Sequence, residues 1–235
     1  MDEYLKVYDI NVSNKFRLGA NGDGGYVIGK LSGEYDCYIS AGVSDEESFS
    51  RDFIKMYNLT NQNSFAFDGT ITNYPYQFTK NITFYKVNIG PIKDDNNANL
   101  SYFMNNFNNI FLKMDIEGAE FDWLLSLTDD NLSKFKQIAI ELHDLNGDGF
   151  GCTKDKKLSC LQKLSKTHYI IHAHANNYNK IINNIPDVIE LTYVRKDCFT
   201  NELQLNKSQL PIPGIDFKNS LLYPEIDLNF PPFVN

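Results

Sequence analysis

Short apolar runs alternate along the chain with stretches in which apolar residues recur at helical spacing. The runs with the length and composition of strands are residues 35–39, 64–67, 82–87, 110–114, 137–142, 168–174 and 188–195. Helical spacing occupies residues 46–57, 121–127 and 156–165. Strands separated by helix-length intervals predict parallel βαβ units, so the pattern favours an α/β fold with a doubly wound sheet.

The segment that follows the last strand has a different character. Residues 201–235 hold five of the eight prolines, which are excluded from helix interiors and central strands. We therefore expect an extended tail that lies on the domain. Because chains below about 250 residues seldom split, we predict one domain over residues 1–235, with a glycine-rich loop at 17–30 and this tail at 201–235.

The composition disfavours two classes of partner. Hydrophobic residues make up 42% of the chain and aromatic residues 14%, which is enough for a sizeable core. The formal net charge of -8 argues against nucleic-acid phosphates and anionic membranes, since both reward clustered Lys and Arg, and it favours a small-molecule substrate. No apolar run approaches the roughly 18 residues of a membrane span, so we expect a soluble, cytoplasmic protein.

The residues after each strand are the first candidates for ligand contacts, because open α/β sheets bind ligands outside the carboxyl ends of their strands. Gly42 follows a strand and precedes a helix, where a glycine lets a ligand approach the backbone closely. We expect it to form the floor of a cofactor pocket, with an ordinary turn as the alternative. Asp68 ends the next strand, where a carboxylate can bind both ribose hydroxyls or cap the following turn.

The sharpest motif is Lys-Met-Asp-Ile-Glu-Gly-Ala-Glu at residues 113–120, which places Asp115, Glu117 and Glu120 at the end of an apolar strand. Carboxylates this close repel one another, so they are usually kept for ligand bonds, a metal or proton transfer. The alternative is a helix start at which the acids complement the dipole. We expect a functional role for the motif.

A glycine-rich loop precedes the first sheet strand. Asp23, Gly24 and Gly25 lie in a run whose backbone N–H groups can bind a carboxylate or another anion. Arg17 can add a bidentate contact to an acid. A hairpin turn is the alternative, and the two interpretations are compatible.

Glu141 and His143 follow a fully apolar strand and should lie over the same crevice as Asp115. A histidine of near-neutral pKa can take the proton from an alcohol, whereas a histidine packed at the sheet edge is the alternative. These residues and Glu117 can also gather a divalent ion, which leaves a magnesium-assisted route open, but no resident metal is expected.

Asn176 and Asn177 end the next strand, where we expect them to contact a hydroxylated substrate, with plain surface polarity as the alternative. The four cysteines are scattered without a CxxC pair. This spacing fits buried thiols better than a zinc site or a disulfide framework.

Taken together, these motifs resemble the FkbM-type methyltransferases, whose hallmark is a Lys-hydrophobic-Asp-hydrophobic-Glu-Gly-Ala-Glu run. The residues that match it are Lys113, Asp115, Glu117, Gly118, Ala119 and Glu120. The likeness extends over most of the chain, to Arg17-Leu-Gly, Asp23-Gly-Gly-Tyr26, Ile39-Ser-Ala-Gly-Val, Phe67-Asp68 and Glu141-Leu-His143.

The resemblance implies a Rossmann-like class I methyltransferase sheet, mostly parallel with an antiparallel strand near the C-terminus. It implies S-adenosylmethionine as methyl donor and a hydroxyl on a sugar or polyketide as the typical acceptor. Of these we expect a sugar, nucleotide-linked or in a glycan. The chain departs from the acid-x-Gly-x-Gly turn usual in class I enzymes, because Ser40-Ala-Gly42 carries one glycine. We therefore expect the loop at Asp23, Gly24 and Gly25, with Arg17, to help hold the methionine end of the donor.

The catalytic residues expected on this basis are His143 as base, Asp115 as its partner or substitute, and Glu117 to orient the substrate or the helix. Glu141 is expected on the substrate side and Asp115 also on the donor side. A nicotinamide-dependent oxidoreductase would need a Gly-x-Gly-x-x-Gly turn that the chain lacks. A non-catalytic carbohydrate-binding or interaction protein on the same fold stays open, as does a homodimer.

Overall fold

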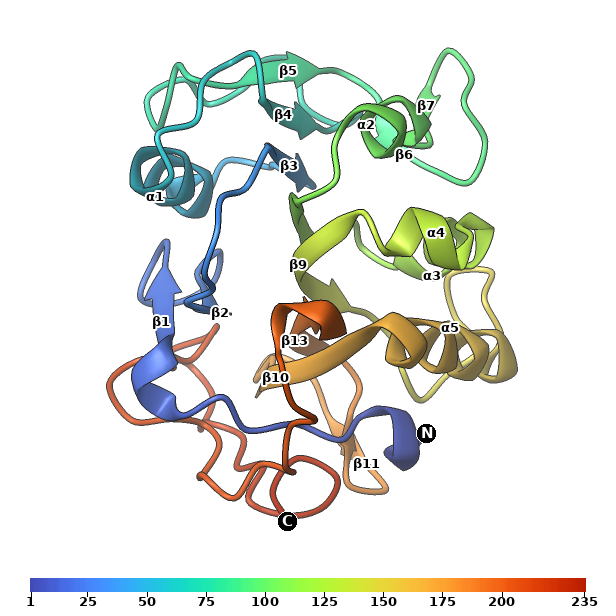
Figure 1. The fold of residues 1–235 in the computed structure, drawn as a ribbon. Helices are drawn as coiled ribbons and strands as arrows, with labels where there is room; N and C mark the ends of the chain where they lie inside the picture. Colours follow the sequence, from blue (N-terminus) through green and yellow to red (C-terminus); the bar gives the residue numbers. More distant parts are fainter.

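The structure is a computed structural model that describes residues 1–235 and is built around a seven-stranded sheet (Figure 1). The strands, in their order across the sheet, are β10 (His168–Ala175), β13 (Ile189–Arg195), β9 (Phe135–Leu142), β8 (Ile110–Met114), β3 (Cys37–Ala41), β4 (Ser64–Phe67) and β5 (Thr83–Tyr85). Neighbouring strands from β5 to β9 run parallel, whereas β13 is antiparallel to both β9 and β10. The doubly wound, mostly parallel sheet with an antiparallel strand near the C-terminus is therefore confirmed.

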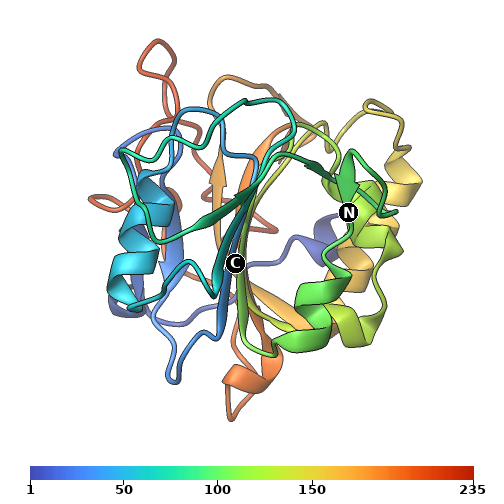
Figure 2. The same cartoon turned by 90° about the horizontal axis from the view of Figure 1, so that it is seen from above.

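Helices cover both faces of this sheet, as the view along it shows (Figure 2). One face carries α1 (Ser48–Met56) and the hairpin of β1 (Lys15–Leu18) and β2 (Tyr26–Gly29). The other carries α2 (Ser101–Asn106), α3 (Glu120–Ser126), α4 (Asp129–Leu132) and α5 (Lys154–Thr167). No helix combines the length and the apolar character that crossing a bilayer would need.

Short elements account for the main differences from the sequence pattern. The pattern did not predict α2, α4 or the two-stranded pairs β6 (Asn88–Ile89) with β7 (Asn97–Ala98) and β11 (Ile181–Ile182) with β12 (Ile185–Pro186). Such elements are too short to show a period. The start of α4 depends instead on a capping box, in which Thr128 and Asn131 bond each other's backbone N–H groups.

The α1 face of the sheet is held by aromatic packing. Phe53 on α1 lies over Phe111 of β8 and Tyr38 of β3, with ring centroids 4.2 Å and 4.9 Å away. All three side chains are fully buried. Burying rings of this size contributes on the order of 2–3 kcal/mol each. This packing fixes α1, and with it the loop that joins the helix to β3.

The β1–β2 hairpin docks on β9 and β13 through buried polar groups. The Gln137 side chain accepts a hydrogen bond from the Gly29 N–H at 2.8 Å and donates to the Gly29 carbonyl at 3.3 Å. The Thr192 hydroxyl donates to the carbonyl of Val27. These bonds satisfy hairpin backbone groups that burial would otherwise leave unpaired.

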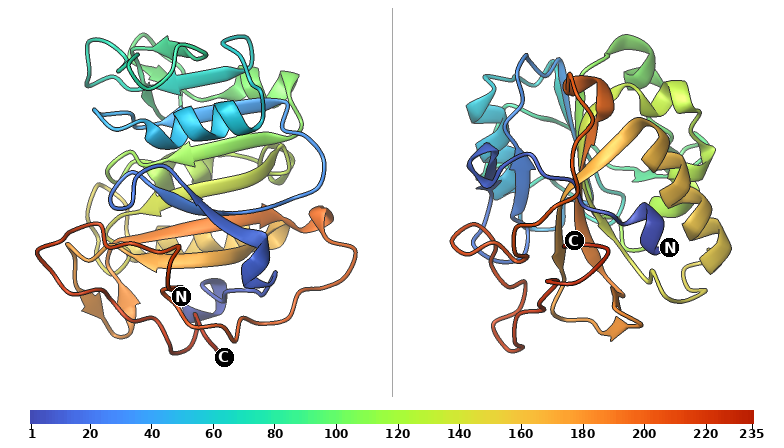
Figure 3. Two further views of the ribbon diagram at one scale, coloured as in Figure 1. Left: turned by 90° about the vertical axis from the view of Figure 1, so that its left-hand side faces the viewer. Right: turned by 60° about the horizontal axis from the view of Figure 1, so that its bottom comes forward.

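The tail after residue 198 runs in extended form beside the N-terminal segment and the edge of the sheet (Figure 3). The Asn206 N–H donates to the carbonyl of Val7 at 2.8 Å, and Asp216 lies 2.9 Å from His172 Nε2. Leu210 and Phe233 are fully buried in the larger core cluster. The tail is therefore part of the packed structure.

His168, at the start of β10, makes the fold sensitive to acid. Its Nε2 lies 2.8 Å from the carbonyl oxygen of Phe135, and burial lowers its pKa to about 4. Between the unfolded pKa near 6.5 and the folded value, only the unfolded chain binds this proton, so stability falls as the pH drops through that window. We expect a loss of about 3 kcal/mol at pH 4 relative to pH 7, measured by urea unfolding.

The His168→Gln variant is the matched test, because an amide keeps a donor for the Phe135 carbonyl and does not titrate. The variant should lose most of the pH slope between 4 and 6.5. An unchanged slope would assign the acid sensitivity to other groups.

Candidate functional site

A cavity of about 680 Å³ lies at the edge of the sheet where the strand order reverses. β4 and β5 are placed to one side of β3, and the chain then crosses to β8 and β9 on the other side. Ligands of doubly wound folds bind at this switch point. The predicted site residues that line the cavity are Asp23, Gly24, Gly42, Asp68, Asp115 and Glu117.

Gly42 lets the ends of β3 and β8 approach one another. It has φ +79°, and a Cβ at this position would lie 1.6 Å from the carbonyl oxygen of Asp115. The approach is fixed from the other side by the Asp115 N–H, which donates to the Ala41 carbonyl at 2.9 Å. Only glycine fits here, for reasons of both backbone conformation and space.

Asp68 organises the loop that follows β3. One carboxylate oxygen accepts the N–H groups of Val43 and Ser44, each at 3.0 Å, and the other accepts the N–H and hydroxyl of Thr70 at 2.7 Å and 2.6 Å. Burial acts to raise the pKa of Asp68, but these hydrogen bonds outweigh it and lower the pKa. The side chain is thus a stable carboxylate at the cavity wall.

The glycine-rich loop is a hairpin turn that brings Asp23 and Gly24 to the cavity. Arg17 lies behind the loop and donates to the carbonyls of Ala20, at 2.7 Å, and of Gly22. A Cβ on Gly25 would lie 2.1 Å from the Ala20 carbonyl oxygen, so this position also requires glycine. Arg17 and Gly25 therefore shape the loop and do not line the cavity.

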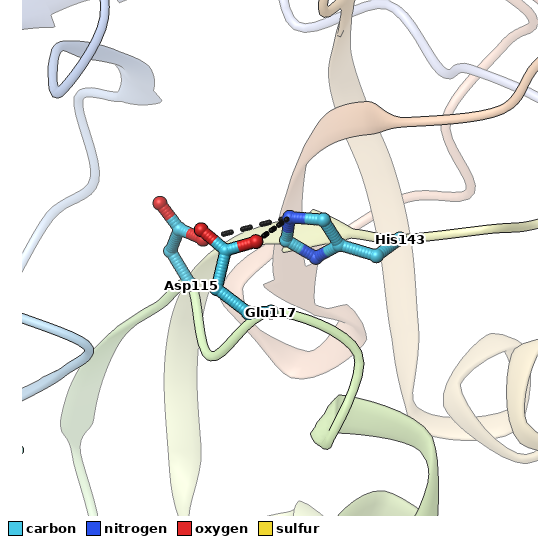
Figure 4. Close-up of side chains that lie close together, drawn as sticks. All are labelled: Asp115, Glu117 and His143. Atoms are coloured by element: carbon cyan, nitrogen blue, oxygen red, sulfur yellow. Dashed lines mark ion pairs between the residues drawn. The ribbon is translucent and has the colours of Figure 1, made fainter. Parts of the chain in front are cut away.

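Asp115, Glu117 and His143 meet beside the cavity (Figure 4). The Nε2 atom of His143 lies 3.5 Å from the Oε2 atom of Glu117 and 3.8 Å from the Oδ1 atom of Asp115. A Glu141 oxygen is 3.7 Å from the same nitrogen. On the other side of the ring, Nδ1 lies 3.1 Å from the fully buried Glu120. Carboxylates thus surround the imidazole.

This surrounding charge decides the protonation of the histidine. Burial acts to lower the pKa of His143, but the hydrogen bond and charge of Glu120, with the charges of Glu141 and Asp115, raise it to about 9. Burial and the charges of Asp115 and Glu190 also raise the pKa of Glu141. At neutral pH the imidazole is therefore cationic unless another cation enters the cluster.

Glu120 is the residue of this cluster whose contacts the sequence did not show. Its Oε1 atom accepts the N–H groups of Ile116 and Gly118, at 3.0 Å and 3.2 Å, in addition to its contact with His143. It thereby fixes both the loop after β8 and the orientation of the ring. The motif showed an acid at this position, but only the structure shows that it points inward.

The two predicted substrate contacts directly after β10 are not part of the cavity lining. Asn176 donates to Glu141 at 2.7 Å, and Asn177 donates to the carbonyl of Ser220 in the tail at 2.8 Å. Both side chains are buried. Asn176 is thus tied to the carboxylate cluster, and Asn177 fastens the tail to the end of β10.

Similarity to known proteins is found at the level of one sequence family. No curated protein is significantly similar to it. Among solved structures, the precorrin-6y C5,15-methyltransferase from Geobacter metallireducens is similar at 12% identity and a TM-score of 0.34, over 71% of this chain and 84% of that chain, a likeness too distant to support an argument. The sequence model of the methyltransferase FkbM domain matches residues 6–178. The chain therefore belongs to the FkbM family of methyltransferases.

Proposed function

We propose that this methyltransferase transfers the methyl group of S-adenosylmethionine to a hydroxyl of a sugar, either nucleotide-linked or part of a glycan. The observation that carries the proposal is the cavity at the switch point, with Gly42 at its floor and Asp68 and Asp115 on its walls. We further propose that residues 1–235 act as one methyltransferase domain, because tail residues such as Leu210 and Phe233 belong to its core.

The donor is proposed to bind with its ribose at Asp68 and its methionine end toward Asp23, Gly24 and Asp115. Loop groups already occupy about four acceptor positions of the Asp68 carboxylate. A ribose hydroxyl therefore replaces one of these donors. The Thr70 hydroxyl is suited to yield, because it rotates about a single bond while the three backbone N–H groups are fixed.

The acceptor is proposed to lie toward Glu141, with His143, Asp115 and Glu117 activating its hydroxyl. In the reaction the oxygen forms a bond to the methyl carbon as the sulfur–carbon bond breaks, and the electron pair of that bond stays on sulfur. The hydroxyl proton passes to a carboxylate of the cluster, with Asp115 as the candidate, because His143 is already protonated at neutral pH. Positioning two reactants in line supplies much of the acceleration. Asn176 and Asn177 support this side through Glu141 and the tail.

Calorimetric titration with S-adenosylmethionine and S-adenosylhomocysteine tests the donor assignment. Binding of both, followed by methyl transfer to a sugar nucleotide or glycan, is the expected result. A folded protein that binds neither ligand would overturn the donor and leave a non-catalytic carbohydrate-binding protein on this fold as the better proposal.

Replacing the ribose carboxylate should weaken donor binding. We expect Asp68→Ala to lower the affinity for S-adenosylhomocysteine by about 10- to 100-fold, because a charge-assisted hydrogen bond contributes roughly 1.5–3 kcal/mol. Asp36→Ala is the matched control, since Asp36 also accepts two backbone N–H groups, those of Asn108 and Asn109, but does not line the cavity. Equal losses in the two variants would contradict the ribose assignment.

A further inference from the structure

The cluster of Asp115, Glu117 and His143 has the composition and geometry of a metal site. One donor atom of each residue lies within 4.8 Å of the others. Asp115 and Glu117 come from the turn after β8, and His143 follows β9, so two adjacent strand ends bring the donors together (Figure 4).

The two distances from the histidine fit one shared ion, and the two carboxylates lie within 4.8 Å of each other. Donors about 2.1 Å from a common ion lie roughly 3.0 to 4.2 Å from one another, depending on the angle between them. The Nε2 atom of His143 is 3.5 Å from Glu117 and 3.8 Å from Asp115. The Oε2 atom of Glu141, at 3.7 Å from Nε2, is a candidate for a fourth position.

The histidine is held with its Nε2 atom toward this centre. Its side chain is 9% exposed, and the contact of Nδ1 with Glu120 holds a proton on that side of the ring. A metal ion that replaces the proton on Nε2 then binds the lone pair of that nitrogen. No hydrogen bond is made by Nε2. The Oδ1 atom of Asp115, which faces Nε2, is buried without a hydrogen-bond partner. Nε2 of His143 and Oδ1 of Asp115 therefore face the same place, and neither makes a hydrogen bond.

The charge of the cluster is not balanced by the protein. Every ion pair of Asp115, Glu117 and Glu141 is to the single imidazole of His143. The nearby Lys113 ammonium donates instead to the carbonyl of Gly42 at 2.6 Å. A sulfonium donor supplies positive charge but accepts no ligand atoms, so it does not account for the convergence of an imidazole nitrogen and carboxylate oxygens.

We propose that Asp115, Glu117 and His143, with Glu141 in reach, bind one divalent first-row transition-metal ion that takes the acceptor hydroxyl as a further ligand. Carboxylates alone would suit Mg²⁺ or Ca²⁺, whereas an imidazole ligand favours the transition ions, among which Mn²⁺ also accepts carboxylates readily. The inference rests on the proposed function and refines it: the imidazole acts as a ligand, and the ion lowers the pKa of the hydroxyl, whose proton passes to water.

The test uses metal-free full-length protein and Mn²⁺, with binding followed by electron paramagnetic resonance. We expect one ion per chain and a nitrogen coupling from the imidazole in the pulsed spectrum. The His143→Gln variant should lose the nitrogen coupling, and Glu117→Gln should weaken binding by about tenfold or more. Glu117 is 84% exposed, so this variant keeps the fold even if a substitution at the buried histidine does not.

Asp45→Asn is the matched control, because it removes a negative charge from the same cavity lining without touching the donor set. Its Mn²⁺ affinity should stay within about twofold of the parent protein. Folded protein that binds no Mn²⁺, or that binds it equally well in Glu117→Gln, would overturn the metal site.

A parallel titration with S-adenosylhomocysteine separates this inference from the proposed function. If the protein binds S-adenosylhomocysteine but not Mn²⁺, the metal site alone is contradicted. If it binds Mn²⁺ but not S-adenosylhomocysteine, the donor assignment alone is contradicted. Binding of both supports the two together.

Discussion

Gly42→Ala is expected to lower the free energy of unfolding by about 2–5 kcal/mol and to abolish donor binding. The left-handed backbone at φ +79° costs alanine about 1–2 kcal/mol, and the added Cβ would lie 1.6 Å from the Asp115 carbonyl oxygen. Relieving that overlap pushes apart the ends of β3 and β8, which adds the cost of overpacking, typically 1–3 kcal/mol. The same movement displaces Asp115, so the cavity wall is lost with the stability.

Gly151→Ala measures the cost of the backbone conformation alone, so its difference from Gly42→Ala gives the steric part of the effect. Gly151 has nearly the same backbone conformation, φ +73°, but a Cβ there has no heavy atom within 4 Å. We expect it to cost about 1–2 kcal/mol in urea unfolding and to leave the affinity for S-adenosylhomocysteine unchanged. If the two variants were equally destabilised, backbone strain alone would explain the effect and the close approach of β3 and β8 would not matter.

The sheet could be predicted from the sequence because its strands are short apolar runs with clear ends. The predicted strands at 64–67 and 110–114 coincide with β4 and β8, since Asp68 and Asp115 end the two runs. The docking of the β1–β2 hairpin could not be predicted. It depends on Gln137, a polar residue that is fully buried because Gly29 and Tyr35, far away in the sequence, supply its hydrogen-bond partners.

The candidate site could likewise be predicted only in part. The order of residues after each strand placed Gly42, Asp68 and Asp115 together, because carboxyl ends of parallel strands meet at one edge. The order of residues does not show which side chains are buried. The sequence did not show that Glu120 would point inward and leave His143 with its Nε2 atom toward Asp115, because the direction of a side chain after a helix start depends on what packs around it.

Asp144→Ala is expected to destabilise the loop that follows His143 by about 3 kcal/mol. The ammonium of Lys157 is fully buried and has Asp144 as its one ion-pair partner, 2.8 Å away. Removing the partner of a buried charge costs about 3–5 kcal/mol, and the lower end applies because the Asp144 side chain is 23% exposed. The same carboxylate accepts the N–H of Gly149, next to Phe150, whose ring packs 6.4 Å from that of His143. Loss of stability should therefore be accompanied by weaker Mn²⁺ binding.

The double variant Asp144→Ala with Lys157→Met shows whether the buried charge is the cause. Removing the ammonium as well leaves no unpaired charge, so the double variant should unfold at a higher urea concentration than Asp144→Ala alone. The Asp144→Asn variant keeps an acceptor oxygen and tolerance of the left-handed backbone, φ +52° at this position, and should lie between the parent protein and Asp144→Ala. If the double variant were less stable than Asp144→Ala, the hydrogen bonds of Lys157 to the Asp144 and Gly147 carbonyls would contribute more stability than the unpaired ammonium costs. Lys157 would then stabilise the loop as a hydrogen-bond donor and not as a partner in an ion pair.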